Sequence, residues 1–333
     1  MNTPDSPERV TTKLQRRAFQ TFFVMLALLV VSATLTLISV EHPGNVVVAS
    51  ENPTPFGYTV SLLLFLMPLG ILAWWFLRNP TLQFPRKAFW WTIGVLVPSG
   101  LVLDVLFGTT FFTFENSGAH LGILIPALGG SVPVEEFVFY ITGFALILLM
   151  YVWCDEYWLK AYNVPSYEEE AKSIARIVRF HPASLILGGV LLAAAFVYKK
   201  LVGPSPEGMP WYFTYLVLVA IIPAAGFFET AKPFINWRAF GFTFFPILLI
   251  SLLWEVTLAI PYQWWGYREE ALIGISVGAW SRLPIEAVCV WLAVTFTTVI
   301  IYEVMKVWKA TGKKAREAFL GMQTKQAATA CPT

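Results

Sequence analysis

Long apolar stretches alternate with short polar segments along almost the whole chain. A helix needs about 20 apolar residues to cross the hydrocarbon core of a bilayer, and its backbone groups must be hydrogen-bonded within the segment. Eight stretches meet this length, and we expect each to be a transmembrane helix. Their approximate ranges are 19–40, 57–78, 88–107, 132–154, 182–200, 210–229, 239–260 and 283–306. The pattern predicts an all-α polytopic membrane protein.

The composition supports the same class. Of the 333 residues, 57% are apolar and only 13% are charged, against about 25% charged residues in soluble domains. The three cysteines (Cys154, Cys289 and Cys331) lie far apart, so they indicate neither a zinc site nor a disulfide framework. A net charge of +2 is too small to indicate a nucleic-acid partner. We therefore expect membrane lipid around the protein and no nucleic acid bound to it.

The basic residues predict the orientation of the eight spans. Successive loops lie on alternate sides of the membrane. On this basis, 19 of the 23 lysines and arginines fall on the side that also carries both chain ends. The other side has four, namely Lys199, Lys200, Arg268 and Arg282. Basic residues are enriched in cytoplasmic loops, so both termini are predicted to be cytoplasmic. In the longest cytoplasmic connection, a capping-box pattern predicts a short helix from Ser166 through Val178.

Four acidic residues near the ends of the predicted helices reveal an internal repeat. Asp104 is followed by Glu135 after 31 positions, and Glu255 is followed by Glu286 after the same interval. Each of these glutamates stands two positions after a proline, and Pro68 and Pro223 interrupt the second span of each half. We expect a parallel repeat of two four-helix halves. The predicted units are 1–160 (first repeat), 161–180 (cytoplasmic connector), 181–310 (second repeat) and 311–333 (cytoplasmic tail).

The repeat brings these acids to one depth, near the outer ends of the helices. A carboxylate inside a membrane is costly, which makes it a candidate for function. A structural alternative is that a glutamate after a proline simply begins a helix, where the helix dipole favours negative charge. The matched acid upstream of each copy favours function. Crowded carboxyl groups in a low dielectric cannot all ionise, so we expect a protonated acid facing an apolar cavity.

Such an acid can protonate an alkene, and the resulting cation is stabilised by aromatic faces. Aromatic side chains near the acids are candidates to line the cavity. They are Phe111, Phe112, Phe137, Tyr140, Trp264, Trp265 and Tyr267. Aromatic clusters in membrane proteins also serve packing or interfacial anchoring, and this alternative remains open.

The motifs at 133–136 (Pro-Val-Glu-Glu) and 284–287 (Pro-Ile-Glu-Ala) resemble the Pro-x-Glu-Glu/Asp motif of the small integral-membrane lycopene cyclases. An upstream acid, an aromatic pair and a Gly-Ile before the motif also fit, most clearly in the second half (Glu255, Trp264-Trp265 and Gly274-Ile275). The resemblance covers roughly 57–155 and 208–306. Ala287 departs from the family pattern, in which a second acid is usual. We therefore expect the first half to carry more of the proton chemistry.

The resemblance implies an isomerase-type enzyme of carotenoid biosynthesis in a prokaryotic cell membrane. Its reaction is the acid-catalysed, non-redox cyclisation of the linear ends of lycopene or a related carotenoid. By matching position, Glu135 and Glu286 are the leading catalytic candidates, with Glu136, Asp104 and Glu255 in support. Other enzymes of carotenoid biosynthesis are candidate partners. Glu135→Gln is predicted to abolish ring formation while leaving the protein in the membrane.

We expect no cofactor. No glycine-rich dinucleotide motif follows a strand-like segment, and no P-loop is present. The three histidines (His42, His120 and His181) share no ligand spacing, so we expect no metal. His120, in the predicted outer loop, is a candidate for a proton relay. Two other functions remain open: a carotenoid hydratase that uses the same protonation, and a proton-coupled membrane transporter.

Overall fold

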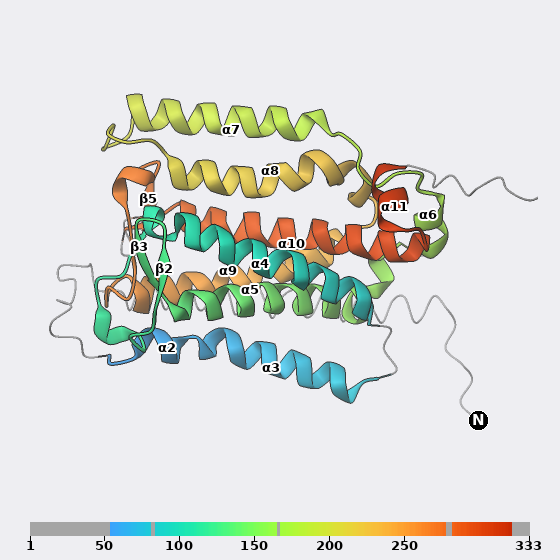
Figure 1. Ribbon diagram of the computed structural model, residues 1–333, viewed down its shortest axis with the longest axis horizontal. Helices are drawn as coiled ribbons and strands as arrows, with labels where there is room; N and C mark the ends of the chain where they lie inside the picture. The colour runs from blue at the N-terminus through green and yellow to red at the C-terminus, as the bar shows by residue number, and fades with distance from the viewer. Residues whose placement is uncertain (1–53, 81–83, 165–166, 278–281, 322–333) are drawn as a thin grey trace, which may run out of the picture.

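The computed structural model describes residues 54–80, 84–164, 167–277 and 282–321 as a bundle of long helices lying side by side (Figure 1). In this part of the chain, seven helical segments are long and apolar enough to cross a membrane. They are Gly57–Arg78, Arg86–Phe111, Val134–Trp158, Pro182–Leu201, Trp211–Ala231, Trp237–Ala259 and Glu286–Thr311. The chain is therefore a predominantly helical, polytopic integral membrane protein.

These seven segments correspond to the second through eighth predicted spans, and every boundary agrees within five residues. The first predicted span, 19–40, lies outside the described residues. The first described segment consists of α2 (Gly57–Ser61) and α3 (Leu63–Arg78). Pro68 lies inside α3 and Pro223 lies inside α8 (Trp211–Ala231), as predicted.

Helix α10 (Glu286–Thr311) runs through the middle of the bundle. It packs against α8, against α4 (Arg86–Phe111) and against α9 (Trp237–Trp254). Helix α5 (Val134–Trp153) packs against α3, α4 and α9. At one edge of the bundle, α7 (Pro182–Leu201) packs along α8, as Figure 1 shows.

One end of the bundle, which we call the strand end, carries three short two-stranded ladders that the all-helical prediction did not include. Strand β1 (Phe112–Thr113) pairs with β4 (Gly266–Tyr267), β2 (Leu124–Ala127) with β3 (Gly130–Pro133), and β5 (Ser276–Val277) with β6 (Leu283–Pro284). Two 3₁₀ turns, η2 (Ser117–Ala119) and η6 (Glu269–Ala271), lie in the same loops. The ladders provide backbone partners for loop segments that would otherwise leave polar groups unpaired.

The opposite end, which we call the connector end, holds the segment between the fourth and fifth predicted spans. Helix α5 continues there as a π-helix, η3 (Cys154–Trp158), followed by the 3₁₀ turn η4 (Lys160–Tyr162). The predicted connector helix exists as α6 (Tyr167–Ser173), but the prediction that it extends through Val178 is wrong. The chain leaves the helix because the N–H groups of Ile177 and Val178 donate instead to carbonyls of α11 (Ala315–Leu320) and its last turn.

Candidate active site

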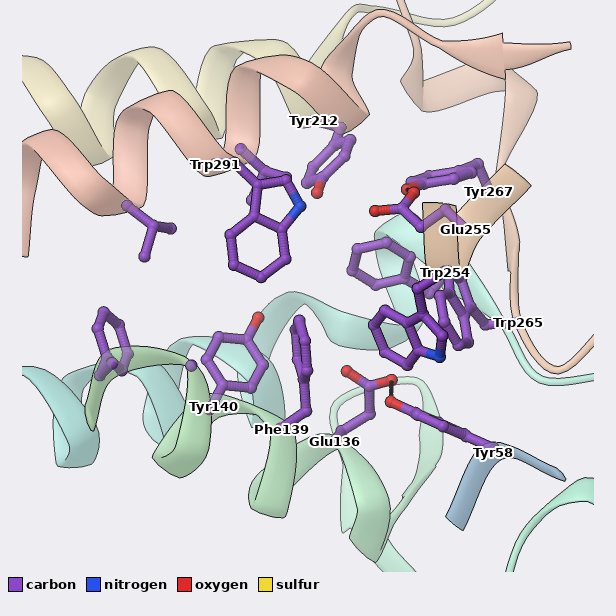
Figure 2. Close-up of a pocket in the computed structure, with 15 residues that line it drawn as sticks. Tyr58, Glu136, Phe139, Tyr140, Tyr212, Trp254, Glu255, Trp265, Tyr267 and Trp291 are labelled. Carbon is purple, nitrogen blue, oxygen red and sulfur yellow. Dashed lines mark hydrogen bonds between the residues drawn. The ribbon is translucent and has the colours of Figure 1, made fainter. Parts of the chain in front are cut away.

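An apolar cavity lies between the helices near the strand end (Figure 2). It contains about 710 Å³ of space not filled by atoms, part of it open to the surroundings. Ten of its lining residues are aromatic, two are glutamates and none is basic. The full set is Tyr58, Phe112, Glu136, Phe139, Tyr140, Gly143, Phe144, Tyr212, Trp254, Glu255, Trp265, Tyr267, Val290, Trp291 and Val294.

Glu136 reaches the cavity from the first turn of α5. The helix begins directly after Pro133, whose backbone is extended (φ −68°, ψ 149°), so the acid stands where the helix dipole favours a negative group. The hydroxyl of Tyr58, on α2, donates a hydrogen bond of 2.5 Å to Oε1 of Glu136. Figure 2 shows the carboxyl group held between Tyr58 and the cavity.

Glu255 reaches the same cavity from the end of α9. At this residue the helix widens into a π-helix, η5 (Glu255–Ala259), a local change often found at functional sites. The hydroxyl of Tyr267 donates a hydrogen bond of 2.5 Å to Oε2 of Glu255. Burial raises the pKa of Tyr267 well above its ordinary value, so this hydroxyl keeps its proton and remains a donor. The indole nitrogen of Trp291 lies on the same side of the cavity (Figure 2), but it has no hydrogen-bond partner among the described residues.

Helical spacing explains which positions line the cavity. Three lining residues follow Glu136 by three, four and seven positions, namely Phe139, Tyr140 and Gly143. All four residues therefore share one face of α5. Val290, Trp291 and Val294 share one face of α10 in the same way. Two facing helices thus supply both long walls of the cavity.

Aromatic rings close the cavity around the two acids. The ring centroids of Trp254 and Trp265 lie 4.3 Å apart, and those of Tyr58 and Trp265 lie 4.9 Å apart. The indole N–H of Trp254 donates to Oγ of Ser61 at 2.8 Å, which fixes the ring. Aromatic faces in a desolvated site attract a cation by about 2 kcal/mol or more each. The enclosure can therefore stabilise a positive charge formed next to the carboxyl groups.

Glu135 and Glu286, the leading candidates from the sequence, do not line the cavity. Oε1 of Glu135 accepts hydrogen bonds from the Thr59 hydroxyl (2.5 Å) and the Leu121 N–H (2.8 Å). Oε1 of Glu286 accepts one from the N–H of Ile273 (2.6 Å). Each of the two acids therefore holds a loop of the strand end against its own helix. The second oxygen of each is buried and has no hydrogen-bond partner among the described residues.

Asp104 is buried within α4. Only 2% of its surface is exposed, and neither carboxyl oxygen has a hydrogen-bond partner in the described part of the chain. It does not line the cavity. A buried carboxyl group without a hydrogen-bond donor is costly to ionise.

Four of the seven predicted aromatic residues line the cavity, namely Phe112, Tyr140, Trp265 and Tyr267. The other three, Phe111, Phe137 and Trp264, are not among its lining residues. Phe111 packs on Tyr212, with ring centroids 5.0 Å apart. Trp264 donates from its indole nitrogen to Oγ1 of Thr54 at 3.0 Å.

Several lining residues were missed at the level of sequence. Phe139, Trp254 and Trp291 were detectable, because Phe139 follows Glu136 by three positions, Trp254 precedes Glu255 directly, and Trp291 follows the Pro-x-Glu motif on one helix face. Tyr58 and Tyr212 had no such signal. They lie far from the motifs along the chain and reach the cavity only through helix packing.

His120, the candidate relay residue, lies near this site without lining it. Its ring contacts Tyr58 and Phe114, with centroids 6.5 Å and 6.4 Å apart, and its side chain is almost fully buried. Burial lowers the pKa of His120 below its ordinary value, and the charge of Glu135 acts in the opposite direction. Among the described residues, no group of three or more His, Cys, Asp or Glu side chains is arranged to hold a metal ion.

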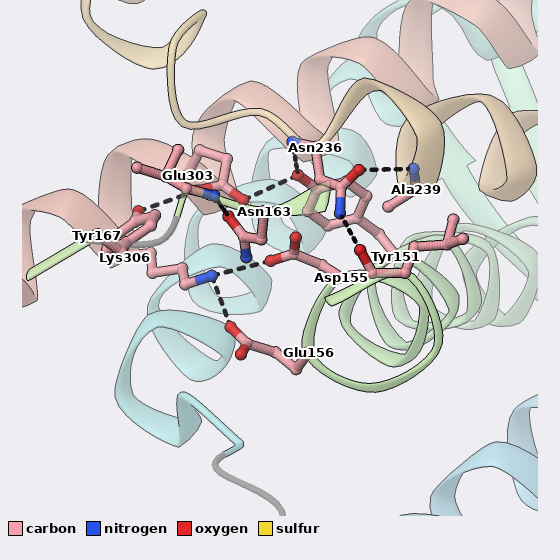
Figure 3. A network of polar contacts seen from close by, with 11 residues as sticks. Tyr151, Asp155, Glu156, Asn163, Tyr167, Asn236, Ala239, Glu303 and Lys306 are labelled. Carbon is pink, nitrogen blue, oxygen red and sulfur yellow. Dashed lines mark hydrogen bonds and ion pairs between the residues drawn. The ribbon is translucent and has the colours of Figure 1, made fainter. Parts of the chain in front are cut away.

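A second buried polar cluster lies at the connector end of the bundle (Figure 3). Lys306 contacts Asp155 at 2.9 Å and Glu156 at 2.6 Å. Glu303 accepts hydrogen bonds from the hydroxyls of Tyr151 (2.9 Å) and Tyr167 (3.0 Å). Burial and the neighbouring Glu303 raise the pKa of Tyr167, which keeps this hydroxyl protonated. The cluster thus connects α5, α6 and α10 through buried polar contacts.

Comparisons with protein-family models, with curated proteins and with solved structures found no match to this chain. The chemistry of the cavity therefore carries the functional argument. Two carboxyl groups face one aromatic, largely apolar space from opposite walls. This arrangement can donate a proton to an apolar substrate at one side and accept a proton at the other.

Proposed function

We propose that the protein is a carotenoid end-group cyclase that acts on the linear ends of lycopene or a related carotenoid. The observation that carries the proposal is the pair of carboxyl groups of Glu136 and Glu255 in one cavity. Ten of the residues that line this cavity are aromatic and none is basic. A charged or polar substrate would find no counter-charge there. A polyene end, in contrast, matches the apolar walls and needs only a proton donor and a proton acceptor.

The proposed reaction takes place in three steps. A protonated carboxyl group adds a proton to the terminal trisubstituted double bond and leaves a tertiary cation. The next double bond attacks this cation, forms a carbon–carbon bond and closes a six-membered ring. A carboxylate then removes a proton from the new cation, so one proton enters, one proton leaves and no net oxidation occurs.

We assign the acid to Glu136 and the base to Glu255. Glu136 and Asp104 are both buried, and Asp104 has no hydrogen-bond partner among the described residues; the ionisation of two buried carboxyl groups would be costly, which favours a retained proton there. Glu255 accepts a hydrogen bond from the hydroxyl of Tyr267, and a donor of this kind stabilises a carboxylate. The aromatic rings between the acids protect the cation from water until the ring closes.

The proposal includes a fold of two related halves. Several contacts at the strand end support it, because they recur at an offset of 151 or 152 residues. The Val134 N–H donates to the Ile123 carbonyl, and the Ile285 N–H donates to the Ile275 carbonyl, both at 2.9 Å. The β1–β4 ladder lies between two backbone hydrogen bonds that connect the proposed halves in opposite directions. The Arg268 N–H donates to the Phe111 carbonyl, and the Asn116 N–H donates to the Gln263 carbonyl. The two donors are 152 positions apart, and so are the two acceptors.

The proposed location is a prokaryotic cell membrane, with the connector end in the cytoplasm. Basic residues near this end support that orientation under the positive-inside rule. Examples are Lys172 and Arg176 in the connector and Lys313 after α10. Other enzymes of carotenoid biosynthesis, as sources of the linear substrate, are the proposed partners.

Expression in cells that accumulate lycopene tests the proposal. We predict that the pink pigment turns orange or yellow and that the product has the mass of lycopene, because cyclisation is an isomerisation. A product heavier by one water would identify a hydratase. Unchanged pigment with the protein present in the membrane would contradict the proposal and favour a transporter or another substrate.

A further inference from the structure

The residues that line the cavity extend along the helices from the strand end. Glu136 and Glu255 lie near its strand end, and the lining then continues along α5 to Gly143 and Phe144. With a rise of 1.5 Å per residue, Gly143 lies about 10 Å farther into the bundle than Glu136. Figure 2 shows Phe139 and Tyr140 on this path, to one side of the two acids.

Gly143 has an unusual environment for a buried residue. Its surface is buried, yet a Cβ added to it would meet no atom within 4 Å. By contrast, a Cβ added to Gly100 would lie 2.8 Å from the ring of Phe144 and 3.1 Å from that of Tyr140. The wall toward α4 is therefore closed, and free space begins at Gly143.

Backbone geometry does not require a glycine at this position. Gly143 lies inside the regular part of α5 and is absent from the residues with positive φ. Glycine is less favourable than alanine in a helix interior, so its presence here lowers helix stability without a conformational need. The space that it leaves open beside the cavity provides a physical reason for it.

We propose that Gly143 forms the passage through which a linear polyene chain leaves the cavity while its end group lies between Glu136 and Glu255. The identity of the chain rests on the proposed function, whereas the passage rests on the free space at Gly143. A side chain at this position would occupy the path of the polyene. The residue would then determine which substrates can enter.

The proposal has a consequence for the order of reaction. The two ends of an extended polyene are separated by its whole length, and one cavity holds both acids. Only one end can occupy the cavity at a time, so a substrate with two linear ends must bind twice. A product with one ring is therefore expected to appear before the product with two rings.

The test measures binding separately from ring formation. Trp254, Trp265 and Trp291 line the cavity, so bound lycopene, which absorbs at longer wavelengths, should quench tryptophan emission of the full-length protein in lipid nanodiscs. We expect Gly143→Leu to weaken lycopene binding by at least about tenfold, because the added side chain would occupy the space of the polyene and clash with it. Gly143→Ala, which favours the helix and adds one methyl group, should remain folded and have a smaller effect in the same direction.

Gly70→Leu is the matched control. A Cβ at Gly70 also meets no atom within 4 Å, but this residue lies on the exposed surface of α3. We expect Gly70→Leu to bind lycopene like the wild type. Weaker binding for Gly143→Leu with normal binding for Gly70→Leu would support the passage. Equal binding by all three variants and the wild type would overturn it.

The two proposals fail in different ways. A wild-type protein that binds lycopene and makes no ring would refute the cyclase, while the binding arm would still decide the passage. A wild-type protein that forms rings, together with Gly143→Leu forming them at the same rate, would refute the passage alone.

Discussion

Adjacent glutamates in α5 have different surroundings, and this difference changes the assignment of the acid. Consecutive residues in a helix point about 100° apart. Glu135 therefore reaches the loop at Leu121, whereas Glu136 reaches the cavity. From the sequence alone, Glu135→Gln was predicted to abolish ring formation. Because Glu135 does not line the cavity and Glu136 does, we now make that prediction for Glu136.

Replacement of either cavity acid is expected to stop the reaction. Glu136→Gln removes the proposed donor and Glu255→Gln the proposed acceptor, and a positioned acid or base typically contributes about 10²–10⁴-fold to a rate. We predict that each variant lowers ring formation per amount of membrane protein by at least about 100-fold, as measured by chromatography of the pigments. Glu115→Gln, at an exposed carboxyl of a strand-end loop, is the control and should retain activity.

Full activity in Glu136→Gln would remove this residue from the mechanism. If Glu136→Gln or Glu255→Gln still made the one-ring product in normal yield, the result would argue for two independent sites instead of one shared cavity.

At the site, the sequence predicted the right kinds of residue and only part of their placement. The acids and four of the aromatic residues could be found because they stand at fixed distances from the Pro-x-Glu motifs. Which of two neighbouring glutamates faces a cavity depends on the rotation of α5, and the partner Tyr58 comes from a helix 78 positions earlier. Neither fact has a local signature.

At the scale of the elements, helices were predictable and their ends were less so. Twenty-residue apolar stretches have one stable solution in lipid, which is why seven spans match. The strands at the strand end are at most four residues long and pair through backbone groups, so side-chain patterning does not reveal them. The end of α6 is set by hydrogen bonds to α11, more than 100 positions away.

The polar cluster at the connector end gives a prediction for stability. The side chain of Lys306 is 11% exposed and its partner Asp155 is fully buried. Removing one partner of a buried ion pair leaves an uncompensated charge and typically costs about 3–5 kcal/mol. We predict that Lys306→Met markedly lowers the temperature of thermal unfolding in detergent.

Lys172→Met is the matched control, because its ion pair with Glu168 is exposed on α6. Exposed pairs contribute about 0–1 kcal/mol, so this variant should unfold near the wild-type temperature. Equal unfolding temperatures for both variants would contradict the structural role of the cluster.

At the scale of the whole molecule, the proposed halves would share one cavity. Phe139, Tyr140 and Gly143 on α5 and Val290, Trp291 and Val294 on α10 stand at the same offset of 151, and all six line it. The acids of the two proposed halves are unequal. The position that corresponds to Glu136 in the second half is Ala287, which carries no acid. The position that corresponds to Glu255 in the first half is Asp104, which does not line the cavity. A duplicated frame would thus provide one asymmetric site with separate acid and base.

The central claim is that a carboxyl group of the cavity, in exchange with water, delivers a proton to the end of a polyene. Incubation of lycopene with membranes containing the protein in D₂O, followed by mass spectrometry of the pigments, tests it directly. If the carboxyl group delivers a solvent-exchanged proton, we predict that each new ring carries one deuterium at the carbon that was protonated. Cyclised product without solvent deuterium would contradict it.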